Sequence, residues 1–434
     1  MVTNLESIAQ NAKLASYTLA SLSTLTKDTA LLTIANKIEQ NKSLILAENK
    51  KDLEAAQKLV ESSELTQSAF NRLKLDENKM RDMVQGIRDV KKLEDPVNKK
   101  LWAMGMDAGL DLYRVSCPIG VIGVIFEARP DVVPQISALA IKSGNAVLLK
   151  GGKEAYHTNV ILAKLINEAL SEVPEFPKGT INLLFTRDDV AQMLSMDKYI
   201  DLLIPRGGNA LVQYVKNNTK IPVMGHADGI CHIYIDDKAD LTKAAPICVD
   251  AKAQYPSACN AVETILIHEN LLLDYLPKLV EELEKADIKV KGCERCIGFV
   301  PHIEPAMKDD WATEYGEKVV SIKAVKDLFD AIAHINVYGS GHTDCILSED
   351  PKCIETFMDL VDSAGVFANV STRFADGFRY GLGAEVGIST SKTHARGPVG
   401  LEGLVIYKYK MYGSGQIVAP YAEGKKTFVH QRII

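Results

Sequence analysis

An alternation of short apolar runs with amphipathic stretches, between residues 121 and 235, constrains the fold of this chain more than any other feature. Short apolar runs predict buried strands, and apolar residues at three- and four-residue steps predict helices. Strands separated by such helices form a parallel sheet that is covered on both faces. We therefore expect a doubly wound α/β domain that binds a nucleotide at its strand ends. The predicted strands are 121–126, 146–150, 181–185, 200–204 and 230–235, and the helices are 131–142, 158–170 and 209–216.

The rest of the chain follows other patterns. Residues 1–100 are predicted to be helical, and Met80, Met83, Val84, Ile87 and Val90 fall on one helical face. Residues 101–115 are typical of a hairpin, and 404–434 form strand-like runs broken by Gly413 and Gly415. An all-β tail on an α/β body is expected to pair with another subunit. A second α/β stretch is predicted to begin with helix 241–252, strand 262–268 and helix 271–285.

Composition and charge narrow the class of protein. The chain has 434 residues, enough for two or three domains, and a net charge of −6 with no basic run, which argues against a nucleic-acid or anionic-membrane surface. The N-terminus lacks the pattern of a secretory signal, and no apolar run is long enough to span a bilayer. The eight cysteines are scattered, as in reduced cytoplasmic proteins. Cys293 and Cys296 form a CxxC without further ligands at zinc spacing, so structural thiols and no metal are expected.

The segment most suggestive of catalysis is Gln254-Tyr255-Pro256-Ser257-Ala258-Cys259-Asn260, which joins a predicted helix to a strand. A thiolate in small polar surroundings is a nucleophile. A cysteine in such a loop is more often a small buried residue, so only the context of Cys259 favours catalysis.

Two glycine turns follow predicted strands. Pro205-Arg206-Gly207-Gly208-Asn209 opens a helix whose free N–H groups attract phosphate, although an ordinary tight turn explains it equally well. Lys150-Gly151-Gly152-Lys153 places two lysines at the end of a strand, where they contact a phosphate or simply lie in solvent.

Together these segments resemble the aldehyde dehydrogenase superfamily, and most closely those of its members that reduce an acyl phosphate. The resemblance is carried by CPIGVIGVIFEARPDV, SGNAVLLKGGKEA, LIPRGGNALV, VMGHADGICHIYID, AKAQYPSACNAVETILIH, ATEYG, INVYGSGHTDCI and ARGPVGLEGLVIYKYKMYGSGQ. It implies an NADPH-binding domain (1–100 and 119–236), a catalytic domain (237–398), and an oligomerisation hairpin and tail (101–118 and 399–434). A homo-oligomer and a transient contact with glutamate 5-kinase are further expectations.

The resemblance also implies a reaction: L-glutamyl 5-phosphate is reduced with NADPH to L-glutamate 5-semialdehyde and phosphate, the second step of proline biosynthesis from glutamate. Cys259 is expected to displace phosphate and carry the glutamyl group as a thioester, which hydride then reduces. The cofactor is expected to contact Lys150, Lys153, Gly207, Gly208, Asn209 and Glu314. Arg129, Arg206 and Arg396 are candidates for the substrate's phosphate or carboxylate, or else members of surface ion pairs.

Three departures from the superfamily pattern refine this expectation. The glutamate that activates water for thioester hydrolysis is replaced in Met224-Gly225-His226, which suits a reductase. Lys153 stands where relatives that use NAD often have a glutamate, which favours NADPH. The oxyanion-hole asparagine aligns with Ala128, so the Cys259 backbone N–H, Arg129 or Asn260 is expected to supply the donor.

Other readings remain open at this point. A CoA-acylating relative would use coenzyme A in place of phosphate, and a hydrolytic aldehyde dehydrogenase would require the missing glutamate. A structural protein on the same fold would be expected to lack the nucleophile. No histidine can be paired with Cys259 from the sequence.

Overall fold

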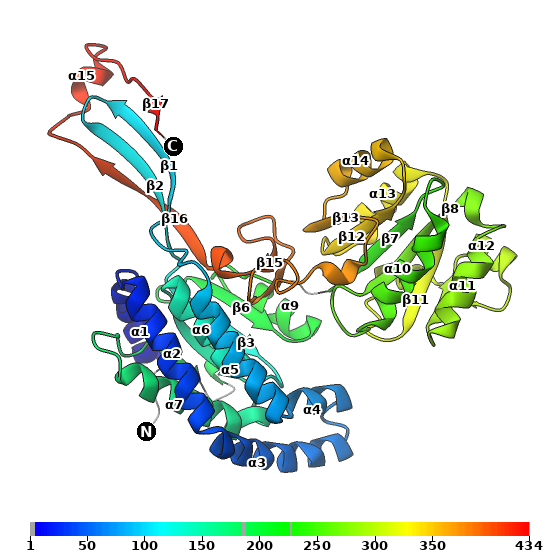
Figure 1. Cartoon of the computed structure of the whole chain (residues 1–434), viewed down its shortest axis with the longest axis horizontal. Helices are drawn as coiled ribbons and strands as arrows, with labels where there is room; N and C mark the ends of the chain where they lie inside the picture. The colour runs from blue at the N-terminus through cyan, green and yellow to red at the C-terminus, as the bar shows by residue number, and fades with distance from the viewer. Residues whose placement is uncertain (1–4, 185–187, 226–227, 434) are drawn as a thin grey trace. The chain divides into compact units, whose positions relative to one another are not determined.

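The computed structural model describes residues 5–184, 188–225 and 228–433. The chain divides into two compact units: unit 1 contains residues 1–224, 383–386 and 400–434, and unit 2 contains residues 225–382 and 387–399. The α/β arrangement expected from the sequence is present, with parallel sheets and smaller antiparallel ones (Figure 1).

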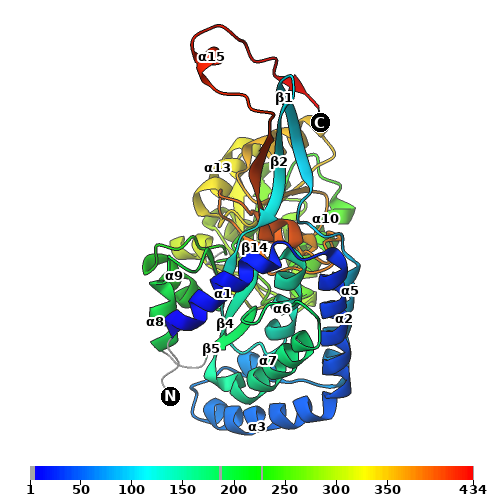
Figure 2. The ribbon, with the colours of Figure 1, turned by 90° about the vertical axis from the view of Figure 1, so that its left-hand side faces the viewer.

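Unit 1 is built around a four-stranded parallel sheet in the order β5-β4-β3-β6. Strands β3, β4 and β6 are apolar at their centres, as expected for a sheet with helices on both faces, whereas β5 contains Asn182. Figure 2 shows α1, α8 and α9 on one side of the strands and α6 and α7 on the other. The elements are α1 (Leu5–Leu19), α2 (Thr24–Gln40), α3 (Lys42–Glu61), α4 (Gln67–Leu73), α5 (Glu77–Lys92), β3 (Val121–Phe126), α6 (Val132–Ser143), β4 (Ala146–Gly151), α7 (Tyr156–Ser171), β5 (Ile181–Leu184), α8 (Asp188–Leu194), β6 (Leu202–Arg206) and α9 (Asn209–Asn217).

Local signals explain where these elements end. Gly144, in the left-handed region at φ 75°, terminates α6, as the Ser143-Gly144 pair predicts. Gly123 lets α8 approach β3, because an added Cβ would lie 2.3 Å from Cε of Met193. Helix α5 buries Met80, Val84, Ile87 and Val90, which confirms the predicted apolar face. Phe185, the last residue of the strand predicted at 181–185, lies outside the described residues.

A four-stranded antiparallel arm projects from the helical part of unit 1 (Figure 1). The predicted hairpin forms β1 (Lys100–Asp107) and β2 (Leu110–Pro118), which turn at Gly109. The C-terminal tail adds β16 (Val405–Tyr412) beside β2, then α15 (Ala419–Ala422) and β17 (Gln431–Arg432) beside β1. Hairpin and tail therefore pair within one chain, and pairing of the tail with another subunit stays a prediction.

Unit 2 contains a seven-stranded parallel sheet in the order β10-β9-β11-β8-β7-β12-β13. Helices α10, α11 and α12 pack on one face, and α13 and α14 on the other. The elements are β7 (Cys231–Ile235), α10 (Leu241–Ala253), β8 (Val262–His268), α11 (Leu276–Lys285), β9 (Lys289–Gly292), α12 (Glu294–Phe299), β10 (Glu304–Pro305), β11 (Val319–Val325), α13 (Leu328–Tyr338), β12 (Thr343–Leu347), α14 (Pro351–Leu360), β13 (Gly365–Ala368), β14 (Gly387–Ser389) and β15 (Gly397–Val399).

Several boundaries differ from the sequence-based expectation; the strand predicted at 200–204, for example, is observed at Leu202–Arg206. The strand 230–235, placed in the cofactor domain by its alternation with earlier elements, pairs as β7 with β8 and β12 of unit 2. The compact units accordingly divide after Met224, earlier than the predicted boundary at residue 236. The helix predicted at 271–285 begins at Leu276, because Pro277 sits in its first turn, where proline is favoured.

Candidate active site

Cys259 lies in the tight loop that joins α10 to β8, and its side chain is half-buried. A backbone hydrogen bond from Ala261 N–H to the Ala258 carbonyl, 2.9 Å long, closes the turn around it. Gly229 packs directly against this turn: a Cβ built there would lie 2.1 Å from the Cys259 carbonyl oxygen. Only glycine allows the two backbones to approach so closely.

The thiol of Cys259 contacts a buried histidine. Nε2 of His342 lies 3.2 Å from Cys259 Sγ, and its Nδ1 lies 2.9 Å from Oγ1 of Thr343. His342 is fully buried at the start of β12, so its ring orientation is held by packing as well as by Thr343. An imidazole in contact with a thiol can accept its proton and leave the nucleophilic thiolate. Sequence reasoning did not find this residue, although it belongs to the YGSGHTD segment.

A second thiol lies behind the first. Cys231 Sγ donates a hydrogen bond of 3.4 Å to the Cys259 carbonyl oxygen and lies 3.8 Å from His342 Nδ1. Burial raises the pKa of Cys231 well above that of an ordinary thiol. Cys231 therefore stays protonated, and Cys259 is the accessible sulfur beside the imidazole.

A buried cation also interacts electrostatically with Cys259. Arg373 is 7% exposed, and its Nε donates a 2.9 Å hydrogen bond to Oε1 of Gln254 in the loop that carries the thiol. Burial and the nearby Arg379 lower the pKa of Arg373, whereas attraction to Cys259 raises it. A guanidinium at this position favours a negative charge on the sulfur. The sequence carried no signal for it, since Arg373 is distant from Cys259 in the chain.

Asn260 is buried, and its side chain secures the loop. Nδ2 donates a 2.8 Å hydrogen bond to the Ala375 carbonyl, and the Asn260 carbonyl accepts a 2.7 Å bond from Thr372 Oγ1. Oδ1 is buried without a hydrogen-bond partner. These contacts support a structural role, and its predicted part in catalysis stays a prediction.

Glu314 is connected to the Cys259 loop through Gly229. Its Oε2 accepts a 3.0 Å hydrogen bond from the Gly229 N–H. Close by, Lys252 and Glu263 form a fully buried ion pair with an Nζ–Oε2 distance of 2.5 Å. Burial raises the pKa of Glu263 to about 7, while Lys252 opposes that shift. The Glu314 carboxylate and the Lys252–Glu263 ion pair thus belong to the same unit as the Cys259 loop.

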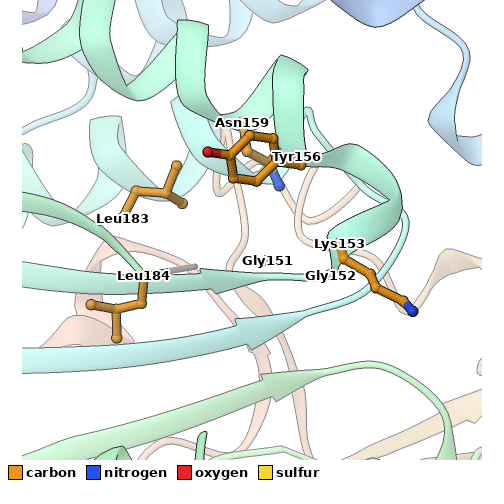
Figure 3. A pocket seen from close by; sticks show the side chains of 7 residues that line it. All are labelled: Gly151, Gly152, Lys153, Tyr156, Asn159, Leu183 and Leu184. Atoms are coloured by element: carbon orange, nitrogen blue, oxygen red, sulfur yellow. The ribbon is translucent and has the colours of Figure 1, made fainter. Parts of the chain in front are cut away.

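In unit 1, the predicted cofactor residues follow the carboxyl end of β4. Lys150 is buried, its Nζ donates a 2.6 Å hydrogen bond to the Gly151 carbonyl, and burial lowers its pKa. Lys153 is exposed at the next turn, and within the described part of the chain it has no ion-pair partner. Figure 3 shows it at the rim of a small pocket lined by Gly151, Gly152, Lys153, Tyr156, Asn159, Leu183 and Leu184.

One side chain that lines this pocket has an unused hydrogen-bond acceptor. Asn159 is 3% exposed, and its Oδ1 is buried without a partner, so it can accept a hydrogen bond from a ligand hydroxyl or amine. Gly151 leaves room for this amide, because an added Cβ would lie 2.3 Å from Asn159 Nδ2. An exposed cation and an unsatisfied acceptor at the ends of parallel strands fit a phosphorylated ribose.

The other glycine turn joins β6 to α9. Gly208 is the N-cap of α9, and Asn209 is its first residue. A Cβ at Gly207 would lie 2.8 Å from Oε2 of Glu127, whereas one at Gly208 would meet open space. A side chain at Gly207 would therefore displace the ends of Leu211 and Glu127, whereas Gly208 leaves the backbone at the helix N-terminus uncovered.

The three arginine candidates lie in different surroundings. Arg129 follows β3 in unit 1, is half-buried, and has no ion-pair partner among the described residues. Arg206 ends the neighbouring strand β6, where it pairs in register with Phe126. Arg396 belongs to unit 2, is exposed, and pairs with Asp362 at 3.0 Å. This last contact is the surface ion pair that the sequence left as its alternative role.

The structure also bears on two departures from the superfamily pattern, at Ala128 and at Met224-Gly225-His226. Ala128 adopts φ 49°, and its N–H donates a 2.6 Å hydrogen bond to Glu154 Oε1, so this donor is already engaged. Met224 is buried and Gly225 has φ 153°, but His226, the third position compared with the hydrolytic glutamate, lies outside the described residues.

Comparison with known proteins identifies the family of this chain. Residues 2–310 match the model of the aldehyde dehydrogenase family. The chain is 58% identical to the gamma-glutamyl phosphate reductase of Brachyspira hyodysenteriae, over 98% of this chain and 99% of that protein. The crystal structure of gamma-glutamyl phosphate reductase from Thermotoga maritima superposes with a TM-score of 0.92 at 39% identity, covering 96% of this chain and 100% of that one.

A more distant structure shares the fold alone. An engineered glycolyl-CoA reductase with bound NADP⁺ matches with a TM-score of 0.64 at 16% identity, over 94% of this chain and 96% of that one. The class defined by fold and site is an oxidoreductase of the aldehyde dehydrogenase type, a family that uses a nicotinamide cofactor. Within that class, the chain belongs to the gamma-glutamyl phosphate reductase family.

Proposed function

We propose that this protein reduces L-glutamyl 5-phosphate to L-glutamate 5-semialdehyde and phosphate, with NADPH as the reductant and Cys259 as the acyl carrier. This is the second step of proline biosynthesis from glutamate. The observation that carries the proposal is the 3.2 Å contact between Cys259 Sγ and Nε2 of the buried His342. In a chain of this family, that contact supports the assignment of Cys259 as the nucleophile.

The chemistry begins with the thiol proton. His342 accepts it through Nε2, and the positive charge of Arg373 stabilises the sulfur anion that remains. The thiolate attacks the 5-acyl carbon, phosphate leaves, and a glutamyl thioester forms on Cys259. NADPH, when bound, supplies the hydride that reduces this thioester. The thiohemiacetal on Cys259 then collapses to the semialdehyde and returns the thiolate.

The cofactor is proposed to bind the carboxyl-end turns of unit 1. Lys150, Lys153 and the Gly207-Gly208-Asn209 turn would hold its phosphates and adenosine ribose, and Glu314 its nicotinamide ribose. Lys153 carries the proposed preference for NADPH, since an exposed ammonium without an ion pair attracts a 2′-phosphate. The buried acceptor of Asn159 in the same pocket supports this placement.

Protection of the thioester from water is the second requirement of a reductase. Neither Met224 nor Gly225 nor His226 has a carboxylate to activate water, so the thioester is proposed to persist until it is reduced. Arg129 is the preferred arginine for the substrate's phosphate or α-carboxylate, because it has no ion-pair partner among the described residues whereas Arg396 is paired with Asp362. Arg206 stays a second candidate on its sequence position alone. A donor to the oxyanion is proposed from the Cys259 backbone N–H or Arg129, since Ala128 and Asn260 donate elsewhere.

The setting of the enzyme is also a proposal. Eight free cysteines suit a reducing cytoplasm. In the described ranges, none of the helices combines the length and apolar character needed to traverse a bilayer. The antiparallel arm is proposed to mediate homo-oligomer formation, and a transient contact with glutamate 5-kinase would shorten the exposure of the labile acyl phosphate to water.

The reaction can be assayed in reverse. Mixing the enzyme with L-glutamate 5-semialdehyde, NADP and phosphate should form NADPH at a rate that depends on phosphate. NADPH formation that needs coenzyme A in place of phosphate would assign a CoA-acylating activity. NADPH formation that is equally fast without phosphate and without coenzyme A would assign a hydrolytic dehydrogenase. Either of these two results would overturn the proposal.

A further inference from the structure

The CxxC motif of unit 2 forms a close pair of sulfurs outside the candidate active site. Cys293 follows β9 and precedes α12, and Cys296 lies in the first turn of that helix. The two Sγ atoms are 3.5 Å apart. A disulfide has a sulfur–sulfur distance of about 2.05 Å, so a shift of roughly 1.5 Å would close the bond.

The two thiols differ in access. Cys293 is half-buried, whereas Cys296 is fully buried against the sheet, with its Cβ near Gly292. The backbone N–H of Ala324 donates a 3.4 Å hydrogen bond to Cys293 Sγ, which favours a negative charge on that sulfur. Contact with the Cys296 thiol lowers the pKa of Cys293, and the same contact, together with burial, raises the pKa of Cys296. Cys293 is thus suited to attack a disulfide, and Cys296 is suited to attack the mixed disulfide that then forms on Cys293.

The pair lies at the opposite edge of the sheet from the catalytic thiol. Cys259 precedes β8 and therefore lies at the amino ends of the strands, whereas Cys293 follows β9 at the carboxyl ends. Strand β11 separates β9 from β8. Within the described ranges no three His, Cys, Asp or Glu side chains are grouped to hold a metal ion. The pair is thus neither part of the proposed reaction nor a recognisable metal site.

We propose that Cys293 and Cys296 form a reversible thiol–disulfide site that reacts with small disulfides such as oxidised glutathione. The Cys293 thiolate attacks the small disulfide, forms a mixed disulfide and releases one thiolate. Cys296 then attacks the Cys293 sulfur, its proton passes to the departing second thiolate, and the protein disulfide closes. In total, one small disulfide is reduced to two thiols while two protein thiols are oxidised to one disulfide.

The test uses the full chain with Cys259→Ala, so that the catalytic thiol does not compete. The protein is incubated with oxidised glutathione, alkylated and digested with trypsin without reduction. Cleavage after Arg295 places the two cysteines in separate peptides, so the disulfide appears as a linked peptide pair. We expect this pair to form about tenfold or more faster than any modification of Cys353, a half-buried thiol whose pKa burial raises.

Two further variants separate attack from resolution. Cys296→Ser should accumulate a glutathione adduct on Cys293, and Cys293→Ser should form neither adduct nor linked peptides. Cys353→Ser is the matched control and should oxidise like the parent. The proposal is overturned if Cys293 and Cys296 are alkylated as completely as Cys353, or if Cys296→Ser forms no adduct. The peptide map of the parent protein shows whether Cys293 and Cys296 are oxidised, even if one of these variants fails to fold.

Discussion

The two parallel sheets carry their candidate functional groups at opposite edges. In unit 1, Lys153 and the Gly207-Gly208 turn follow the carboxyl ends of β4 and β6. In unit 2, Gly229, Cys259 and His342 precede the amino ends of β7, β8 and β12. Carboxyl ends of parallel strands are the general location of nucleotide sites, and the first sheet follows that rule. The second sheet uses its other edge, where loops entering three adjacent strands bring sulfur and imidazole together.

The electrostatic character of the two edges differs as well. Lys153 is exposed and unpaired among the described residues, as suits a group that attracts an anion from solvent. His342 and Arg373 are buried, as suits a group that accepts the Cys259 proton and a group that stabilises the charge on the Cys259 sulfur. Changes at the unit 1 edge should therefore alter cofactor choice, and changes at the unit 2 edge should alter the chemical step.

The largest effect is expected from Cys259→Ala. Turnover should fall by about 10⁴-fold or more, because the acyl group has no carrier, while NADPH binding measured by fluorescence titration should be unchanged. Measurable turnover at more than about a hundredth of the parent rate would contradict the assignment of the nucleophile.

His342→Ala should lower kcat by about 10²- to 10⁴-fold, the usual range for loss of a general base. The dependence of kcat on pH should also change in this variant, since the Cys259 thiol would have to ionise without the imidazole. His302→Ala, which removes an exposed histidine paired with Glu284, is the control and should behave like the parent. An unchanged pH profile in His342→Ala would reduce this residue to a packing role.

Lys252→Met should destabilise the protein by about 3–5 kcal/mol in urea unfolding, because the buried Glu263 carboxyl would lose its partner and would have to take up a proton to stay folded in the interior. Lys252→Met combined with Glu263→Leu should recover much of this loss, since neither charge then remains. Lys285→Met, at an exposed ion pair, should change stability little. An equal loss of unfolding free energy in the single and double variants would show that the packing of these side chains, and not their ion pair, stabilises this part of unit 2.

Lys153→Glu should produce the smallest change. The ratio of kcat/KM for NADPH to that for NADH should fall about 10- to 100-fold, the equivalent of one charge-assisted hydrogen bond. Lys164→Glu, an exposed lysine on α7, is the matched control and should leave the ratio unaltered. A preserved preference in Lys153→Glu would place the 2′-phosphate elsewhere.

Elements predicted from the sequence were those with strong local patterns. The strand Val262–His268 was predicted to the residue and the hairpin forms as expected, because alternation and turn residues are local signals. The pairing of the tail with this hairpin is implied by the family resemblance and not by a local pattern, and pairing with another subunit stays a prediction. The sheet to which strand 230–235 belongs was not predicted, since local pattern does not specify a neighbouring strand.

The proposed site was predicted only in part for a related physical reason. Cys259 was found because its own loop is distinctive, but its partner His342 is 83 residues away in the chain. Arg373 was missed in the same way, and the Asp362 partner of Arg396 became visible only in the folded chain. Contacts between separate strands depend on tertiary packing, which no single segment encodes.

The most direct test of Cys259 as acyl carrier omits phosphate from the reverse reaction. With L-glutamate 5-semialdehyde and NADP alone, we predict a burst of NADPH equal to about one equivalent per active site, because the thioester cannot be released. Mass spectrometry should then find a glutamyl adduct on the peptide that carries Cys259. Continued turnover without phosphate, or an adduct on another residue, would contradict the account.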